Sequence, residues 1–78
     1  MTRLLLLGPA REAAGVRLDE FEATTVGEVL RQAVARYGFD FEQILAVSQV
    51  WVNGEVATRE DSVGPYDEVE VLPPVSGG

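Results

Sequence analysis

Two consecutive glycines, Gly77 and Gly78, close the printed sequence, and they form the one arrangement in it that suggests chemistry. Because glycine has no side chain, two in succession make a segment thin enough to enter a narrow active-site channel. We expect the α-carboxylate of Gly78 to be the reactive group, since ATP can activate a carboxylate, which then accepts a nucleophile. The alternative is a chain end of small residues without a chemical role.

The composition leaves few other candidates for catalysis. The 78 residues include no cysteine, no histidine and no lysine. A thiol nucleophile, an imidazole base or metal ligand, and a Schiff-base amine are therefore all missing. We expect no metal site and no bound cofactor, and we expect that the chain is not an enzyme on its own.

The charge of the chain bears on its partners. Six arginines stand against thirteen carboxylates, which gives a net charge of −7. This balance argues against nucleic-acid binding, which needs clustered basic residues. An acidic surface fits a basic protein partner, although it can equally serve solubility alone. The apolar run Leu4–Leu7 is too short for a membrane span or a signal peptide, so we expect a cytoplasmic protein without membrane attachment.

The residues before the glycines are suited to presenting them. Pro73 and Pro74 lock the backbone in an extended conformation and end the preceding strand. With Val75 and Ser76, they make a tail of residues 73–78 that can reach ~20 Å from the domain. We therefore predict a stiff base, a thin tip and a terminal carboxylate held away from the folded part.

The folded part is predicted to be one small domain, residues 1–72. The clearest signal is Thr25 with Glu28, a capping box that begins a helix over residues 26 to about 37. Asn53-Gly54 is the strongest hairpin signal. The sequence predicts strands over residues 2–7, 16–22, 47–52, 55–57 and 68–72.

Two further segments have weaker helical signals. Residues 9–14 can form one or two helical turns that Gly15 ends. Residues 39–46 are ambiguous, although Asp40 can cap a short helix that reaches Leu45. One main helix packed on a mixed sheet defines an α+β fold. If the first and last strands lie side by side and parallel at the centre, the fold is a β-grasp.

Three large apolar residues are candidates for partner binding. Trp51, Phe21 and Leu72 each fall out of phase with the core face of their predicted strands. We expect them on the sheet face away from the helix, where they would form a hydrophobic patch. The alternative is that they cover a sheet edge or pack beneath a loop.

The segment from Asp67 to Gly78, with its Pro-Pro-Val-Ser-Gly-Gly ending, resembles the C-terminus of the small subunit of molybdopterin synthase, a MoaD-type ubiquitin-like sulfur carrier. Residues 25–30 and the hairpin Val52-Asn53-Gly54-Glu55 resemble the same family in the same order. The resemblance covers the whole chain and implies a β-grasp fold.

The resemblance also implies a function. An ATP-dependent activating enzyme would adenylate the carboxylate of Gly78, and delivery of sulfur would give a thiocarboxylate. The carrier would then dock on the large subunit of molybdopterin synthase, and the tail would enter that subunit's active site. There the sulfur would be donated to the cyclic pyranopterin precursor. Catalytic side chains would then belong to the partners.

Other functions fit the same features. Carriers for cysteine synthesis, tRNA thiolation or thiamine synthesis share the fold and the Gly-Gly end. A ubiquitin-like modifier joined to protein lysines is a different class, and a binding module with an incidental tail is a third.

Overall fold

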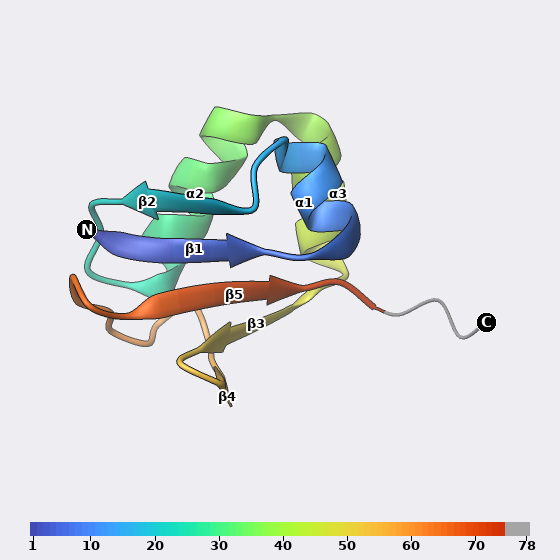
Figure 1. Ribbon diagram of the computed structural model, residues 1–78. Helices are drawn as coiled ribbons and strands as arrows, with labels where there is room; N and C mark the ends of the chain where they lie inside the picture. Colours follow the sequence, from blue (N-terminus) through green and yellow to red (C-terminus); the bar gives the residue numbers. More distant parts are fainter. Residues whose placement is uncertain (75–78) are drawn as a thin grey trace.

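Five strands form one mixed sheet, and three helices cover one of its faces (Figure 1) in the computed structural model, which describes residues 1–74. The predictions for Val75, Ser76, Gly77 and Gly78 lie outside the described residues. The elements are β1 (Thr2–Leu6), α1 (Gly8–Ala14), β2 (Leu18–Phe21), α2 (Val26–Tyr37), α3 (Phe39–Ala46), β3 (Gln49–Val52), β4 (Glu55–Val56) and β5 (Glu68–Leu72).

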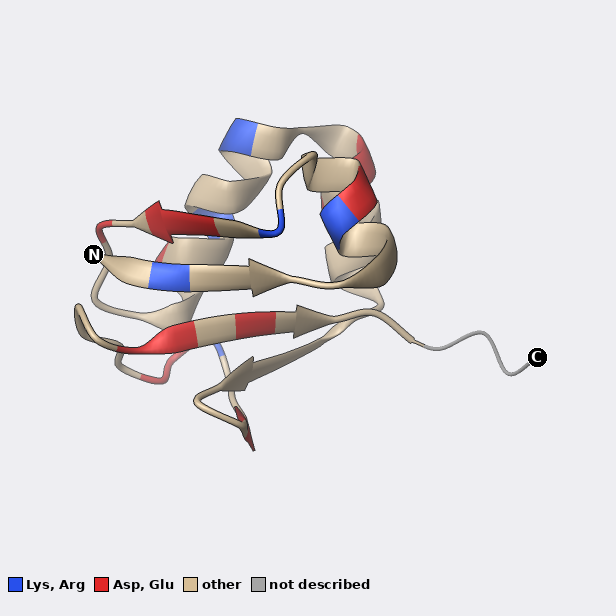
Figure 2. Ribbon diagram, viewed as in Figure 1, with Lys and Arg blue, Asp and Glu red and all other residues tan. Residues whose placement is uncertain are grey.

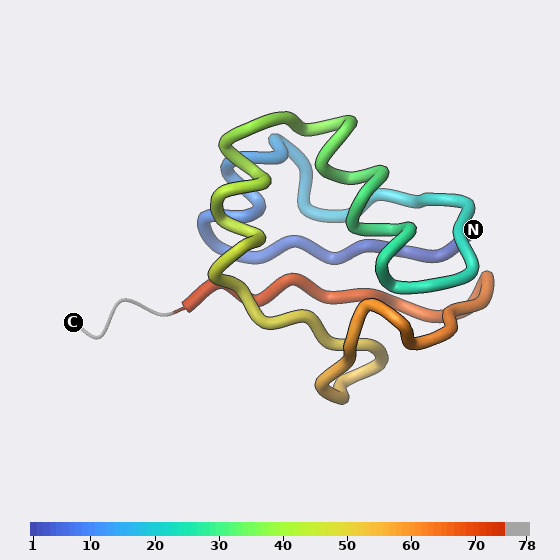
Figure 3. The backbone as a smooth tube through the Cα atoms, turned by 180° about the vertical axis from the view of Figure 1, so that it is seen from behind, coloured from blue at the N-terminus to red at the C-terminus, as the bar shows by residue number. Residues whose placement is uncertain are grey.

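The strand order is β2-β1-β5-β3-β4, so the last strand of the chain occupies the middle of the sheet. β5 is parallel to β1 and antiparallel to β3, while the two outer pairs are antiparallel. Viewed from behind, β1 and β5 run side by side below the helices (Figure 3). The predicted ubiquitin-like β-grasp fold is confirmed.

The core lies between the sheet and the helices. Strict alternation in β5 buries Val69 and Val71, and β1 contributes Leu4 and Leu6 to the same layer. The helices close this layer with one aliphatic stripe from α2, two residues of α3 and one of α1, namely Val26, Val29, Leu30, Ala33, Phe41, Leu45 and Ala10.

Helix α2 begins at the predicted capping box. The Thr25 hydroxyl accepts from the Glu28 N–H at 3.2 Å, and the Glu28 carboxylate accepts from the Thr25 N–H at 3.1 Å. Gly38 ends the helix at φ 97°, a conformation that favours glycine. Helix α3 follows at once, with Gly38 rather than Asp40 at its N-cap. The prediction that Asp40 caps this helix is therefore wrong, because the helix begins one residue before it.

The hairpin between β3 and β4 turns at Asn53-Gly54, as predicted. Both residues have positive φ, 51° and 86°, which is the requirement of a type I′ turn. The Asn53 amide donates to the Asp67 carboxylate at 2.8 Å and accepts from the Glu68 N–H at 3.0 Å. The turn is therefore attached to the start of β5.

Strand β2 has the opposite phase from the one predicted. Phe21 is 1% exposed in the core, whereas Leu18 is 44% exposed on the other face. The Phe21 ring packs edge-on against Tyr37 of α2, and the Arg36 guanidinium lies 4.2 Å from its centroid. The prediction that Phe21 lies on the face away from the helix is wrong, because the aromatic contact with α2 turns it inward.

Candidate functional site

The point where the tail leaves the domain is held by the middle of the sheet. Val71 pairs with Leu6 of β1 on one side and with Val50 of β3 on the other, and Leu72 pairs with Gln49. Pro73 follows directly and is half-buried. A hollow of about 530 Å³ lies at this position, between β3 and the two prolines. The chain therefore leaves the sheet from a fixed origin.

Apolar side chains follow one row across the sheet face that the helices leave uncovered. The strand register places five residues opposite one another in this outer row, in the order Leu18, Leu5, Glu70, Trp51 and Val56. Val56 is 68% exposed, and Leu5 and Trp51 are half-buried. Four large apolar residues on one surface of a small chain are typical of a protein-binding face.

The predicted patch residues are only partly brought together here. Trp51 and Leu72 lie on the outer face, as expected from the alternation of their strands, while Phe21 does not. Sequence reasoning missed Leu5, Leu18 and Val56. These three residues can be identified only from the strand register, because the register shows that they are aligned with Trp51 across the sheet.

Figure 2 shows acidic residues on β2 and β5, and the strand register places two of those on β5, Glu68 and Glu70, on the face of the outer row. Glu68 pairs with Arg3 of β1 at 3.8 Å. The Glu70 carboxylate accepts from the Gly54 N–H at 3.1 Å and stands in the middle of the row. The outer row is therefore apolar at its ends and carries a negative charge at its centre, which favours a partner with a complementary basic group.

Hydrogen bonds hold other carboxylates in their charged form. The Asn53 amide and the Gly64 N–H lower the pKa of Asp67. The Tyr37 hydroxyl at 2.6 Å, with the Glu20 N–H and the Arg36 guanidinium, lowers the pKa of Asp19. These groups fix loops and strands in place, and none of them faces the base of the tail.

Within residues 1–74, no three acidic side chains converge to form a possible metal site. No helix in this part of the chain has the length and apolar character needed to cross a membrane.

A comparison with protein families matches residues 4–78 to the ThiS family, nearly the whole chain. The chain belongs to the ThiS family. It is thus a small ubiquitin-like sulfur carrier of the ThiS/MoaD type, as the sequence resemblance implied. A search of curated protein sequences gave no significant match.

Solved structures share the fold of this ThiS-family chain. Small archaeal modifier protein 1 from Haloferax volcanii is 27% identical, with a TM-score of 0.87 over 99% of this chain and 98% of that one. A chain of the BexX/CysO complex from Amycolatopsis orientalis is 21% identical, with a TM-score of 0.84 and full coverage of both chains. A chain of the complex of subunits 1 and 2 of molybdopterin-converting factor from Helicobacter pylori is 19% identical, with a TM-score of 0.71 over 99% and 97%.

The last two likenesses, below 25% identity, are evidence of the fold alone. Each of those two chains was solved in a complex with another protein.

Proposed function

We propose that this carrier serves molybdenum cofactor biosynthesis as the small subunit of molybdopterin synthase. The observation that carries the proposal is the Pro-Pro-Val-Ser-Gly-Gly segment placed directly after the middle strand of a ThiS-family domain. A fixed origin at Leu72 and two stiff prolines suit a segment that must enter the active site of another protein.

The proposed chemistry takes place at the α-carboxylate of Gly78. A carboxylate oxygen attacks the α-phosphate of ATP on an activating enzyme, which gives an acyl adenylate and releases pyrophosphate. Sulfide from a sulfur donor then attacks the acyl carbon and displaces AMP, which leaves a thiocarboxylate. On the large synthase subunit, the sulfur of the thiocarboxylate attacks a carbon of the cyclic pyranopterin precursor, and an oxygen substituent of that carbon leaves with the electron pair of the broken C–O bond. Water then hydrolyses the acyl–sulfur bond, which regenerates the carboxylate.

The outer row and Leu72 supply the docking surface in this proposal. The outer row and Leu72 lie on the same face of the sheet, and Leu72 directly precedes the tail. A partner that covers this face would therefore meet the start of the tail at a fixed distance from its contacts with the outer row. The charge of Glu70 in the row fits a basic residue on the partner.

Intact mass measurement of the protein from its native host tests the carrier chemistry. We expect a form heavier by the difference between a sulfur and an oxygen atom, located at Gly78 by fragmentation. The thiocarboxylated protein with the large subunit should convert the pyranopterin precursor, and a chain lacking Gly77 and Gly78 should not. Retained conversion without the two glycines would refute the proposal.

Trp51→Ala tests the docking surface. Because buried tryptophans often dominate protein interfaces, we expect affinity for the large subunit to fall by ~30-fold or more. Tyr66→Ala is the matched control, since Tyr66 is 93% exposed and lies outside the outer row. Equal affinity of Trp51→Ala and the unaltered chain would remove Trp51 from the interface.

A protein modifier is the second candidate, favoured by the likeness to small archaeal modifier protein 1. In that case the Gly78 carboxylate would be found in isopeptide bonds to lysines of other proteins. Mass spectrometry of conjugates separates the two candidates. Conversion of a cysteine or tRNA precursor, with none of the pyranopterin, would instead assign the carrier to another sulfur pathway.

A further inference from the structure

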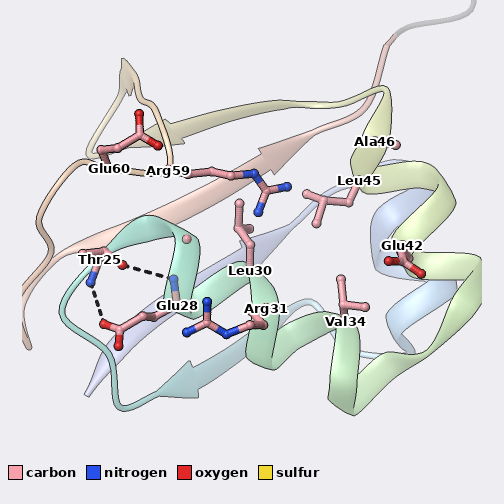
Figure 4. A pocket seen from close by; sticks show the side chains of 11 residues that line it. Thr25, Glu28, Leu30, Arg31, Val34, Glu42, Leu45, Ala46, Arg59 and Glu60 are labelled. Atoms are coloured by element: carbon pink, nitrogen blue, oxygen red, sulfur yellow. Dashed lines mark hydrogen bonds between the residues drawn. The ribbon is translucent and has the colours of Figure 1, made fainter.

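A groove runs along the helical side of the domain and reaches the outer row at Val56. Its larger part is a hollow of about 700 Å³ between α2, α3 and the loop that follows β4 (Figure 4). A second hollow of about 370 Å³ adjoins it and extends toward β3 and β4. The two hollows share Leu30, Leu45, Ala46 and Arg59, so they form one continuous groove.

The floor of the groove is apolar. Leu30 of α2 and Leu45 of α3 line the groove from the core, where they are 1% and 6% exposed. Val34 and Ala46 extend this surface along the two helices. A floor of this kind fits one or two aliphatic side chains of a ligand.

Two arginines stand over this floor. Arg31 reaches from α2 and Arg59 reaches across from the loop, with Leu30 between them (Figure 4). Among residues 1–74, the ion pairs of arginine involve only Arg3 and Arg36, and neither Arg31 nor Arg59 donates a side-chain hydrogen bond. Both guanidinium groups therefore keep their donors available for a ligand.

Three carboxylates also line the groove, and the pKa of Glu28 is lowered by the Thr24 hydroxyl first and also by the charge of Arg31. The Glu28 carboxylate is already bound at the start of α2 by the Thr24 N–H at 2.7 Å and the Thr24 hydroxyl at 2.6 Å. Figure 4 shows the Glu60 carboxylate pointing away and Glu42 at the far end, on α3. The middle of the groove is thus a cationic, apolar-floored site on a chain whose net charge is −7.

We propose that this groove binds an acidic segment of a partner protein, in which leucine-type side chains alternate with carboxylates. The apolar side chains would lie on Leu30 and Leu45, and the carboxylates would pair with Arg31 and Arg59, since guanidinium binds carboxylate through two parallel hydrogen bonds. The net charge of −7 disfavours binding of such a segment over most of the remaining surface. Val56 of the outer row also lines the smaller hollow, whereas the larger hollow, which holds Arg31, shares no residue with the outer row.

Titration of the ¹⁵N-labelled full chain with a blocked peptide, acetyl-Glu-Leu-Asp-Leu-Leu-Glu-amide, tests this proposal by NMR. We expect shifts concentrated at amides around Arg31, Val34, Ala46 and Arg59, and weaker binding at high salt. The peptide with glutamine and asparagine in place of its acids should not bind. Shifts spread evenly over the surface, no shift at all, or equal binding of the neutral peptide would overturn the proposal.

Two charge variants separate the groove from a general effect of charge. Arg31→Gln with Arg59→Gln should weaken binding by about fivefold or more, since two surface ion pairs are lost. Arg11→Gln with Arg17→Gln makes the same change in net charge outside the groove lining and should leave the affinity within about twofold. An equal loss in both double variants would overturn the proposal.

A further variant leaves both arginines in place. Ala46 is exposed at the last position of α3, so Ala46→Glu adds a carboxylate where the two hollows meet without disturbing the core. We expect the peptide shifts to disappear while the thermal midpoint and the spread of amide signals stay unchanged. Undiminished binding by Ala46→Glu would refute this placement of the ligand.

Discussion

Tyr37→Phe tests the hydrogen bond that joins α2 to β2. The Tyr37 hydroxyl donates to the Asp19 carboxylate at 2.6 Å and is the largest cause of that residue's lowered pKa. The carboxylate keeps the Glu20 N–H at 2.8 Å and Arg36 at 3.0 Å, and its side chain is 27% exposed. We therefore expect the substitution to lower the free energy of unfolding by ~1–2 kcal/mol, toward the lower end of the range for a hydrogen bond to a charged group. For a domain of this size, this lowers the thermal midpoint by ~4–16 °C.

The variant should also change the response to acid. A carboxyl whose pKa is lower in the folded state contributes stability above its unfolded pKa, and this stability is lost as the pH falls through the folded value. The unaltered chain should therefore lose stability more steeply than Tyr37→Phe below the ordinary value of 3.8.

Urea unfolding at several pH values measures both effects. Tyr66→Phe is the matched control, because Tyr66 is exposed, and we expect its stability and pH profile to be unchanged. An unaltered midpoint together with an unaltered acid profile in Tyr37→Phe would refute the reasoning.

Three further substitutions probe the elements that hold the domain together. Thr25→Ala removes the acceptor for the Glu28 N–H and should cost ~1 kcal/mol in urea unfolding, whereas Thr25→Ser should restore most of it. Phe41→Ala empties a fully buried site, and a cost of ~3–5 kcal/mol should be visible as a large fall in the calorimetric midpoint. Asn53→Ala should raise the pKa of Asp67 toward its ordinary value, which NMR titration of the carboxyl would detect.

The sequence was sufficient to predict the structural features that depend only on residues close together in the chain. The capping box of Thr25 and Glu28 and the Asn53-Gly54 turn each determine a geometry within four residues, and both appear as predicted. The alternation of Val69 and Val71 determines the faces of β5 for the same reason.

The sequence led to wrong or incomplete predictions where packing between distant elements determines which face of the sheet a residue occupies. In β2, the pattern Leu18 to Phe21 fits either phase, and the contact of Phe21 with Tyr37 and Arg36 selects the one observed. The outer row could not be assembled from the sequence either, because its members come from strands whose register follows from pairing. Within the run of four leucines from Leu4 to Leu7, nothing in the sequence marks Leu5 as the half-buried residue that faces outward between the buried Leu4 and Leu6.

The groove could not be predicted from the sequence for the same reason. Arg31 and Arg59 lie far apart along the chain, on a helix and a loop. Gly27 allows the two elements to approach: its N–H donates to the Arg59 carbonyl at 2.9 Å, and a β-carbon at this position would lie 3.1 Å from that oxygen. Only the folded chain shows that this close approach places two cations over one apolar floor.

The middle position of β5 has a mechanical consequence. The strand pairs with β1 from Glu68 to Val71 and with β3 from Val69 to Leu72, the residue before Pro73. A pull along the chain beyond this residue loads both ladders in shear, so their hydrogen bonds resist together instead of opening one after another. The two edge strands, each bonded on one side only, carry little of that load. A protein that draws on this end of the chain therefore pulls on the most force-resistant strand of the domain.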